Sequence, residues 1–191
     1  MLLKLKVAWG ITGSGDFMPE TIQNIKQISQ ENKDLDLYIF LSKAAQKVLT
    51  YYSLDRELAL ISKKIFVEVD SNTTKPFYYI PRALQLGKFQ FFLICPATAN
   101  TVAKIVNGIA DTLITNSVSQ ACKANIPVFI FPVDHKKGKQ TTILPSGDKL
   151  ELEMREVDLE NTERLSRMRS IHVFTNPDEL KNIFRQFPKS Q

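Results

Sequence analysis

Two apolar segments constrain the fold of this chain more than any other feature. Residues 89–98 read FQFFLICPAT and residues 126–134 read IPVFIFPVD, and polar residues follow each run. Continuous apolar runs of this length are typical of strands that are buried on both faces, as in parallel sheets covered by helices. We therefore expect an α/β fold.

The rest of the chain alternates between strand and helix patterns. Apolar runs predict strands, whereas apolar residues three or four positions apart predict helices. On this basis we expect strands at 5–11, 35–42 and 64–70, helices at 17–30 and 43–52, a loop and short helix within 71–85, and two helices separated near Gly108. This order predicts a mainly parallel, doubly wound sheet with right-handed crossovers and helices on both faces.

The last quarter of the chain has a different pattern. Residues 141–154 predict a hairpin around a Pro-Ser-Gly-Asp turn, because polar turn residues separate two strand-like runs. A short charged helix at 157–168 and a strand at 171–174 follow. Residues 176–179 (NPDE) predict a helix start, since proline and acidic residues favour the first turn of a helix.

Composition excludes several classes of protein. The 191 residues are 43% hydrophobic and 24% charged, as in ordinary globular proteins, and no apolar run reaches about 18 residues. The strand-like start, with Lys4 and Lys6 between apolar residues, predicts no signal peptide, and we expect a cytoplasmic protein. The net charge of +5 is scattered, which argues against nucleic acid but permits an acidic or phosphorylated partner.

The cysteines and histidines argue against a metal centre. Cys95 and Cys122 form no CxxC pair, and His135 and His172 are far apart in the sequence. A disulfide framework, an iron–sulfur centre and a zinc site are therefore not expected.

Residues 10–16, GITGSGD, form a glycine-rich turn between a strand and a helix. Helix N-termini at the carboxyl end of a parallel sheet bind phosphate well, although a tight corner without a ligand is the alternative. The nucleotide P-loop requires lysine after its last glycine, where this chain has Asp16, and the order of glycines does not match the dinucleotide fingerprint. Neither ATP nor NAD is supported.

Residues 95–101, CPATANT, form a second polar strand end. Thr98, Asn100 and Thr101 place hydroxyl and amide groups there, and such residues also serve as plain helix caps. Two polar strand ends next to apolar strands favour a pocket for a planar ring system over two independent caps.

The segment PATANT resembles the PASANT motif of the FMN-binding flavoproteins, which include peptidyl-cysteine decarboxylases, phosphopantothenoylcysteine decarboxylase and flavin prenyltransferases. The segments WGITGSG, FLSKAA and IPVFIFPVD agree with that family in order, so the resemblance covers residues 5–135. The hairpin and the NPDEL segment further resemble the archaeoflavoprotein branch.

This resemblance implies noncovalent FMN at a subunit interface of a homo-oligomer with a Rossmann- or flavodoxin-like sheet. FAD or a prenylated FMN stays open. We expect a single domain over 1–191, with an FMN-binding core at 1–135 and the C-terminal hairpin and helices at 140–191. The implied cofactor-binding residues are Thr12, Gly13, Ser14, Gly15, Ser42, Pro96, Thr98, Ala99, Asn100, Thr101 and Asn116.

The family carries several chemistries, and this chain lacks the residues of one of them. Residues 43–94 contain no histidine, and PVDHKKG replaces the PxMNxxMW-like substrate clamp, so a cysteine decarboxylase is disfavoured. A flavin prenyltransferase needs clustered basic residues, for which Arg82, Lys104 and Lys123 are candidates. A dihydromethanopterin-type pterin reductase is a further alternative, with stacking or core aromatics at Trp9, Phe77, Tyr78 and Tyr79.

The resemblance to archaeoflavoproteins implies electron transfer from a ferredoxin to a downstream oxidoreductase or small acceptor. Ferredoxins are usually acidic, and residues 134–139 (DHKKGK) would supply a docking site with three lysines, or simply a solvated turn. No residue is predicted as a general acid or base: His135 is not expected to be catalytic and His172 is expected to be structural. A non-enzymatic flavin-binding module also remains open.

Overall fold

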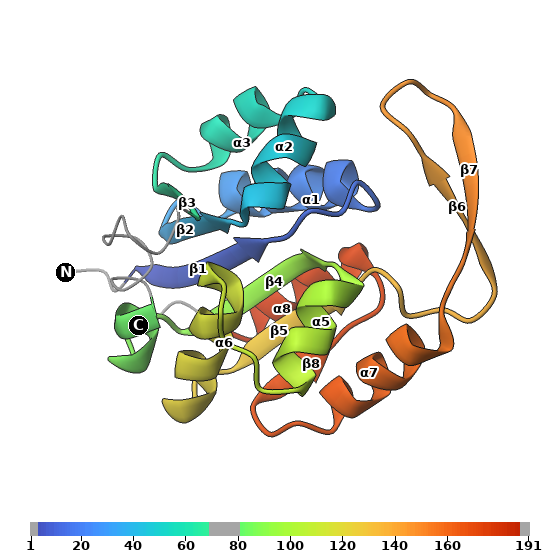
Figure 1. The fold of residues 1–191 in the computed structure, drawn as a ribbon. Helices are drawn as coiled ribbons and strands as arrows, with labels where there is room; N and C mark the ends of the chain where they lie inside the picture. Colours follow the sequence, from blue (N-terminus) through green and yellow to red (C-terminus); the bar gives the residue numbers. More distant parts are fainter. Residues whose placement is uncertain (1–3, 69–80, 188–191) are drawn as a thin grey trace.

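In the computed structural model, which describes residues 4–68 and 81–187, the main sheet of the described part has six strands, all parallel. Its spatial order is β3-β2-β1-β4-β5-β8 (Figure 1). The strands are β1 (Leu5–Ile11), β2 (Leu35–Leu41), β3 (Ile65–Val67), β4 (Phe91–Ala97), β5 (Val128–Pro132) and β8 (Ile171–Val173). The chain starts in the middle, proceeds to the β3 edge and then returns to add β4 beside β1. This confirms the predicted doubly wound α/β fold.

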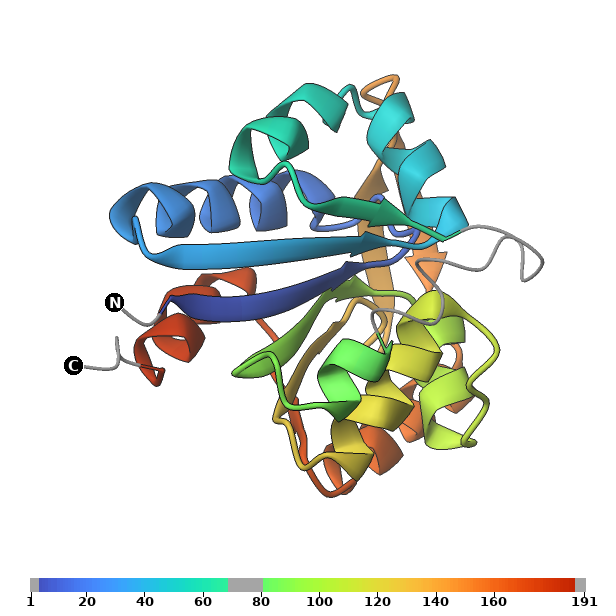
Figure 2. The same cartoon turned by 90° about the vertical axis from the view of Figure 1, so that its left-hand side faces the viewer.

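Helices cover both faces of the sheet, as Figure 2 shows with the strands seen from the side. On one face lie α1 (Met18–Glu31), α2 (Lys43–Tyr51), α3 (Asp55–Ile61) and α8 (Leu180–Arg185). On the other face lie α5 (Ala99–Val106), α6 (Leu113–Lys123) and α7 (Glu156–Ser166). Right-handed crossovers account for this division, because the chain moves in opposite directions from β1 and from β4.

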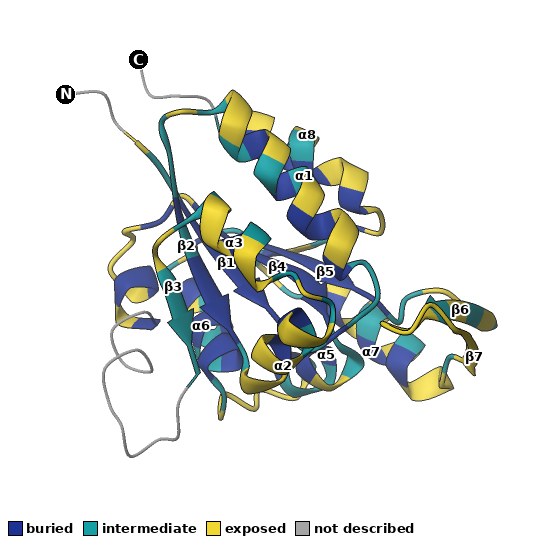
Figure 3. Ribbon diagram, turned by 90° about the horizontal axis from the view of Figure 1, so that it is seen from above, coloured by how far each residue is buried: buried dark blue, intermediate teal, exposed yellow. Residues whose placement is uncertain are grey.

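The strands direct alternate side chains into two separate cores. In β1, Val7, Trp9 and Ile11 pack against α1, whereas Ala8 faces the core under α5 and α6. All seven residues of β4 and all five of β5 are buried, which confirms the reading of the two apolar segments (Figure 3). Burial of both faces explains their nearly continuous apolar sequence.

The predicted hairpin is present as β6 (Lys139–Ile143) and β7 (Lys149–Glu153), which pair in antiparallel register. It extends away from the main sheet (Figure 1), and every residue of β7 is exposed. Among the described residues, two hydrogen bonds hold it to the body: Tyr52 Oη donates to the Ile143 carbonyl at 2.9 Å, and Thr142 Oγ1 donates to Asp16 Oδ2 at 3.1 Å.

The pattern-based elements differ from the structure in a few places. Helix α3 was not predicted, because its seven residues bury only Leu58 and therefore give little helical periodicity. The NPDE segment begins a 3₁₀ turn, Pro177–Glu179, that leads into α8. The candidate aromatics Phe77, Tyr78 and Tyr79 lie outside the described residues. Of the segment 71–85, in which a loop and a short helix were expected, residues 81–85 are described and are helical. Among the described residues, no helix has the length and hydrophobicity needed to cross a membrane.

Candidate functional site

Thr12 joins the carboxyl ends of the two central strands. Its backbone N–H and its hydroxyl both donate to the Pro96 carbonyl, at 3.2 and 2.9 Å, and its Oγ1 accepts from the Thr98 N–H at 2.8 Å. These bonds connect the glycine turn after β1 to the PATANT segment after β4. The two motifs found in the sequence therefore lie side by side in the fold.

The glycines of the turn have a steric role. A Cβ on Gly13 would overlap the Cβ of Ala44 and lie 3.1 Å from the Ala44 carbonyl carbon, and a Cβ on Gly15 would overlap the Tyr52 hydroxyl. Real Cβ atoms do not approach so closely, and both contacts belong to α2 or its C-cap. Gly13 and Gly15 thus allow the turn to pack against α2, whether or not a ligand binds.

A cavity of about 400 Å³ opens at the point where the strand order reverses, between β1 and β4. In open α/β sheets this crevice at the carboxyl ends of the strands is the usual ligand site. The predicted residues in its lining are Thr12, Gly13, Ser42, Thr98, Asn100 and Thr101, and the remaining lining residues are Lys43, Ala44, Glu68, Lys104, Thr112 and Ile114.

The N-termini of α2, α5 and α6 all meet this cavity. Each helix has a hydroxyl N-cap in the lining, Ser42, Thr98 or Thr112, which accepts from the backbone N–H of its third helical residue. Within the described part of the chain, the N–H groups of the second helical residues have no protein hydrogen-bond partner. These residues also line the cavity: Ala44, Asn100 and Ile114.

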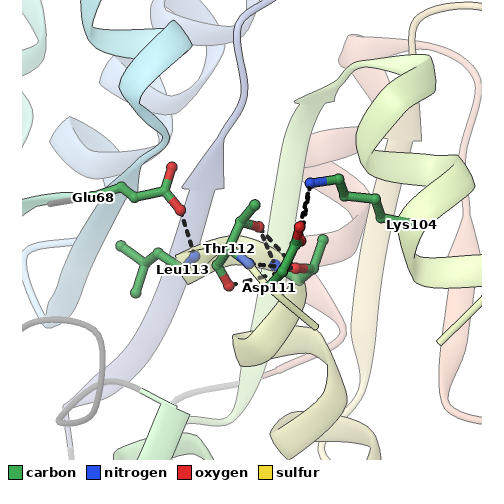
Figure 4. A network of polar contacts seen from close by, with 6 residues as sticks. Glu68, Lys104, Asp111, Thr112 and Leu113 are labelled. Atoms are coloured by element: carbon green, nitrogen blue, oxygen red, sulfur yellow. Dashed lines mark hydrogen bonds and ion pairs between the residues drawn. The ribbon is translucent and has the colours of Figure 1, made fainter. Parts of the chain in front are cut away.

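Charged groups surround these helix ends, as Figure 4 shows. Lys104 lines the cavity and pairs with Asp111 at 2.8 Å. Glu68 accepts from the Leu113 N–H at 2.7 Å and from the Lys43 N–H at 3.3 Å. Lys104 lowers the pKa of the exposed Asp111 carboxyl through its hydrogen bond.

Five predicted residues do not line the cavity. Ser14 is buried within the turn, and Gly15 faces a second cavity of about 470 Å³ under the hairpin. The Pro96 carbonyl bonds Thr12, and the Ala99 N–H donates to Asp134 Oδ2 at 3.3 Å. Asn116 points along α6, where its Oδ1 accepts from Gln120.

Asp134 and His135 follow β5 beside the start of α5. Burial raises the pKa of the Asp134 carboxyl, and its hydrogen bond from Ala99 opposes that effect. His135 Nδ1 donates to the Pro132 carbonyl at 2.7 Å, and its buried Nε2 has no partner among the described residues. Neither residue lines the cavity between β1 and β4.

Other candidates from the sequence are separate from this cavity. Trp9 is fully buried and donates to the Cys95 carbonyl, so it belongs to the core. Burial raises the pKa of the Cys95 thiol to about 12, which makes it unreactive as a nucleophile. Arg82 is exposed, and Lys123 lines a different groove, between α6 and the end of α5, so neither lies with Lys104.

Some site residues had no sequence signal that pointed to this cavity. Glu68 is 45 positions from Leu113, and only the folded sheet brings them together. Thr112 could have been found as the N-cap of the helix LITNS, since threonine before an apolar helical run is a common cap.

Several known proteins are similar to this chain in sequence. A protein of Methanocaldococcus jannaschii named as uncharacterized protein MJ0730 is 50% identical over 179 residues, which is 94% of each chain. A dihydromethanopterin reductase (acceptor) of the same organism is 39% identical over 75% of this chain. This chain spans only 59% of the length of that reductase.

The structure of Burkholderia xenovorans DmrB in complex with FMN, described as a cubic protein cage for redox transfer, is also similar. It superposes with a TM-score of 0.79 and 31% identity over 96% of this chain and 94% of that one. The family model described as Flavoprotein matches residues 1–186. The chain belongs to the Flavoprotein family.

Proposed function

We propose that this chain binds FMN in the cavity between β1 and β4 and uses it to pass electrons from a protein donor to an acceptor. The observation that carries the proposal is the convergence of the α2, α5 and α6 N-termini on one cavity. Its lining includes Ala44, Asn100 and Ile114, whose N–H groups have no hydrogen-bond partner among the described residues. Such groups, together with the helix dipoles, bind phosphate.

The residues present fit an FMN molecule. The helix ends and Lys104 suit its phosphate, and Thr98 and Asn100 supply hydroxyl and amide groups for its polar chain or ring edge. The cavity volume of about 400 Å³ lies in the usual range for small-molecule sites. Bound FMN would supply the redox-active ring, while the protein holds it and controls access to it.

The lining favours electron transfer over acid–base chemistry. The carboxylate among the described lining residues, Glu68, already accepts two backbone hydrogen bonds, and neither histidine of the chain lines the cavity. The separation of Lys104 from Arg82 and Lys123 disfavours the flavin prenyltransferase alternative, because these residues do not form one basic site.

Reduction of a pterin is the second candidate for the reaction. Similarity to dihydromethanopterin reductases (acceptor) from two archaea, at 39% and 40% identity, favours it. The chain covers 59% and 55% of those proteins, so a pterin as the acceptor is part of the proposal. If the acceptor is instead a protein, the FMN of this chain passes its electrons to a downstream oxidoreductase.

The proposed donor is an acidic ferredoxin-like protein that docks on Lys136, Lys137 and Lys139. All three lysines are exposed, and they follow Asp134, which is hydrogen-bonded to the start of α5 at the cavity. A donor on these lysines would therefore be close to the proposed flavin. We further propose a cytoplasmic location and a homo-oligomer that binds FMN at its subunit interface. The hairpin offers apolar surface for contacts between subunits, because its Ile143, Leu150 and Leu152 are exposed.

Rapid mixing without oxygen tests the proposal. FMN-loaded protein is mixed with reduced ferredoxin, then with a dihydropterin or with an oxidoreductase, while the visible absorbance of the flavin is followed. Reduction by ferredoxin followed by reoxidation supports electron transfer, and the acceptor that reoxidises the flavin decides between a reductase and a carrier. A flavin that ferredoxin does not reduce would contradict the proposed donor.

A further inference from the structure

We infer that Glu68 is a specificity residue that weakens the hold of the cavity on a phosphate group, so that a phosphate alone does not bind well. This inference rests on the proposed function, in which a phosphate-bearing flavin occupies the cavity between β1 and β4. The consequence is selection for ligands that bring a planar ring in addition to the phosphate.

Glu68 occupies a defined position at the end of β3. Its backbone N–H donates to the Leu41 carbonyl at 2.8 Å, which fixes the residue beside the end of β2. Its carboxylate then reaches two helices. Oε1 accepts from the Leu113 N–H of α6 at 2.7 Å (Figure 4), and Oε2 accepts from the Lys43 N–H of α2 at 3.3 Å. One side chain thus binds the first N–H of both helices.

These hydrogen bonds use part of the anion-binding capacity of the cavity. A helix N-terminus carries about half a positive charge and attracts anions through its unpaired N–H groups. Glu68 places a full negative charge at two of the helix ends that line the cavity, α2 and α6. The N–H groups of Ala44, Asn100 and Ile114 remain for a ligand, but the ligand must bind beside this carboxylate.

The balance of charge in the lining makes this effect important. Two lysines, Lys43 and Lys104, line the cavity, and Lys104 is paired with Asp111, so its attraction for a ligand phosphate is partly cancelled. Among the described residues that line the cavity, Glu68 is the acidic one. A phosphate monoester carries about two negative charges near neutral pH and is repelled by a nearby carboxylate. Contacts to a planar ring must therefore contribute to binding.

The substitution Glu68→Gln separates the charge from the shape of the side chain. Glutamine has the same length, and its carbonyl oxygen can still accept one of the two backbone hydrogen bonds. Its amide nitrogen cannot accept the other, but the negative charge is gone. Glu68→Asp is the complementary variant, because it keeps the charge and shortens the reach. Glu57→Gln, on α3 in a half-buried pair with Lys26, is the control for a change in net charge.

The experiment measures dissociation constants of FMN and of riboflavin, which lacks the phosphate, for the parent and the three variants. We expect Glu68→Gln to increase the preference for FMN over riboflavin by roughly tenfold, as for removal of one unit charge near a dianion. Glu68→Asp and Glu57→Gln should keep the preference of the parent. Equal weakening of both flavins in Glu68→Gln would show a merely structural role and overturn the inference.

Inorganic phosphate gives a readout that does not depend on flavin binding. Ligands that bind the folded state raise its melting temperature, and we expect phosphate to stabilise Glu68→Gln at lower concentrations than the parent. If the parent binds no flavin while phosphate behaves as expected, the proposed function fails and the role of Glu68 stands. If phosphate stabilises the parent and Glu68→Gln equally, the role of Glu68 is contradicted.

Discussion

The Thr12 hydroxyl and the Thr98 N–H lie 2.8 Å apart, and this contact joins the glycine turn to the PATANT segment. The same hydroxyl donates to the Pro96 carbonyl at 2.9 Å, so it acts as donor and acceptor at once. Both atoms are close to the start of α5, whose N-terminus faces the proposed flavin site. Thr12 therefore helps to hold the start of α5 in position at that site.

Thr12→Val should destabilise the protein and weaken FMN binding. Valine has the same shape but no hydroxyl, so the Thr98 N–H loses its acceptor and the Pro96 carbonyl loses one of its two donors. Leaving a buried polar group without its partner costs about 1–3 kcal/mol. Denaturant unfolding and FMN titration measure the two effects. Thr12→Ser keeps the hydroxyl and serves as the control. If the valine variant has the stability and affinity of the parent, the contact is unimportant.

Gly13→Ala should disturb the packing of the glycine turn on α2. The new Cβ would overlap the Ala44 Cβ, and overpacking of this kind typically costs about 1–3 kcal/mol. The double variant Gly13→Ala with Ala44→Gly moves the methyl group to the other side of the contact. We expect it to be more stable than the sum of the single changes predicts, as measured by a double-mutant cycle of unfolding free energies. Strict additivity would contradict the steric role.

Asp134→Asn should alter the dependence of stability on pH. Burial raises the pKa of Asp134 in the folded state, so its ionised form is disfavoured there. The stability contribution of the protonated form is therefore complete below the ordinary value of 3.8 and is lost as pH rises through the raised pKa. Asparagine stays neutral and can still accept from the Ala99 N–H.

We thus expect Asp134→Asn to be at least as stable as the parent at pH 7, with the difference shrinking toward acidic pH. Urea unfolding at a series of pH values measures this. A variant that is less stable than the parent by the same amount at every pH would show that ionised Asp134 is not penalised in the folded state.

Reversing Lys136, Lys137 and Lys139 to glutamate should slow reduction of the flavin by ferredoxin and weaken the salt dependence of that rate. The lysines are exposed near the start of the hairpin, and complementary charge mainly accelerates association at low salt. The matched control reverses Lys33, Lys63 and Lys88, which are exposed near the amino ends of β2, β3 and β4. If the two triple variants slow flavin reduction equally, the proposed docking site on Lys136, Lys137 and Lys139 is contradicted.

Much of the fold follows from local sequence patterns, and the site follows in part. The apolar segments after residues 88 and 125 predicted the buried strands, because burial on both faces leaves little room for polar residues. Thr98 was recognisable because it directly follows such an apolar segment and precedes a helix. Glu68 was not, since its partners Lys43 and Leu113 come from other parts of the chain and only the sheet order brings them together. Helix α3 was missed because one buried residue, Leu58, gives no periodic signal.

The most direct test of the account is the affinity and stoichiometry of FMN for the purified, flavin-free protein, measured by fluorescence titration and calorimetry against riboflavin. The convergence of helix N-termini on the cavity predicts one FMN per chain, bound more tightly than riboflavin because the phosphate meets unpaired N–H groups. Riboflavin binding as tightly as FMN would contradict the placement of the phosphate. Binding of neither flavin would contradict the central claim.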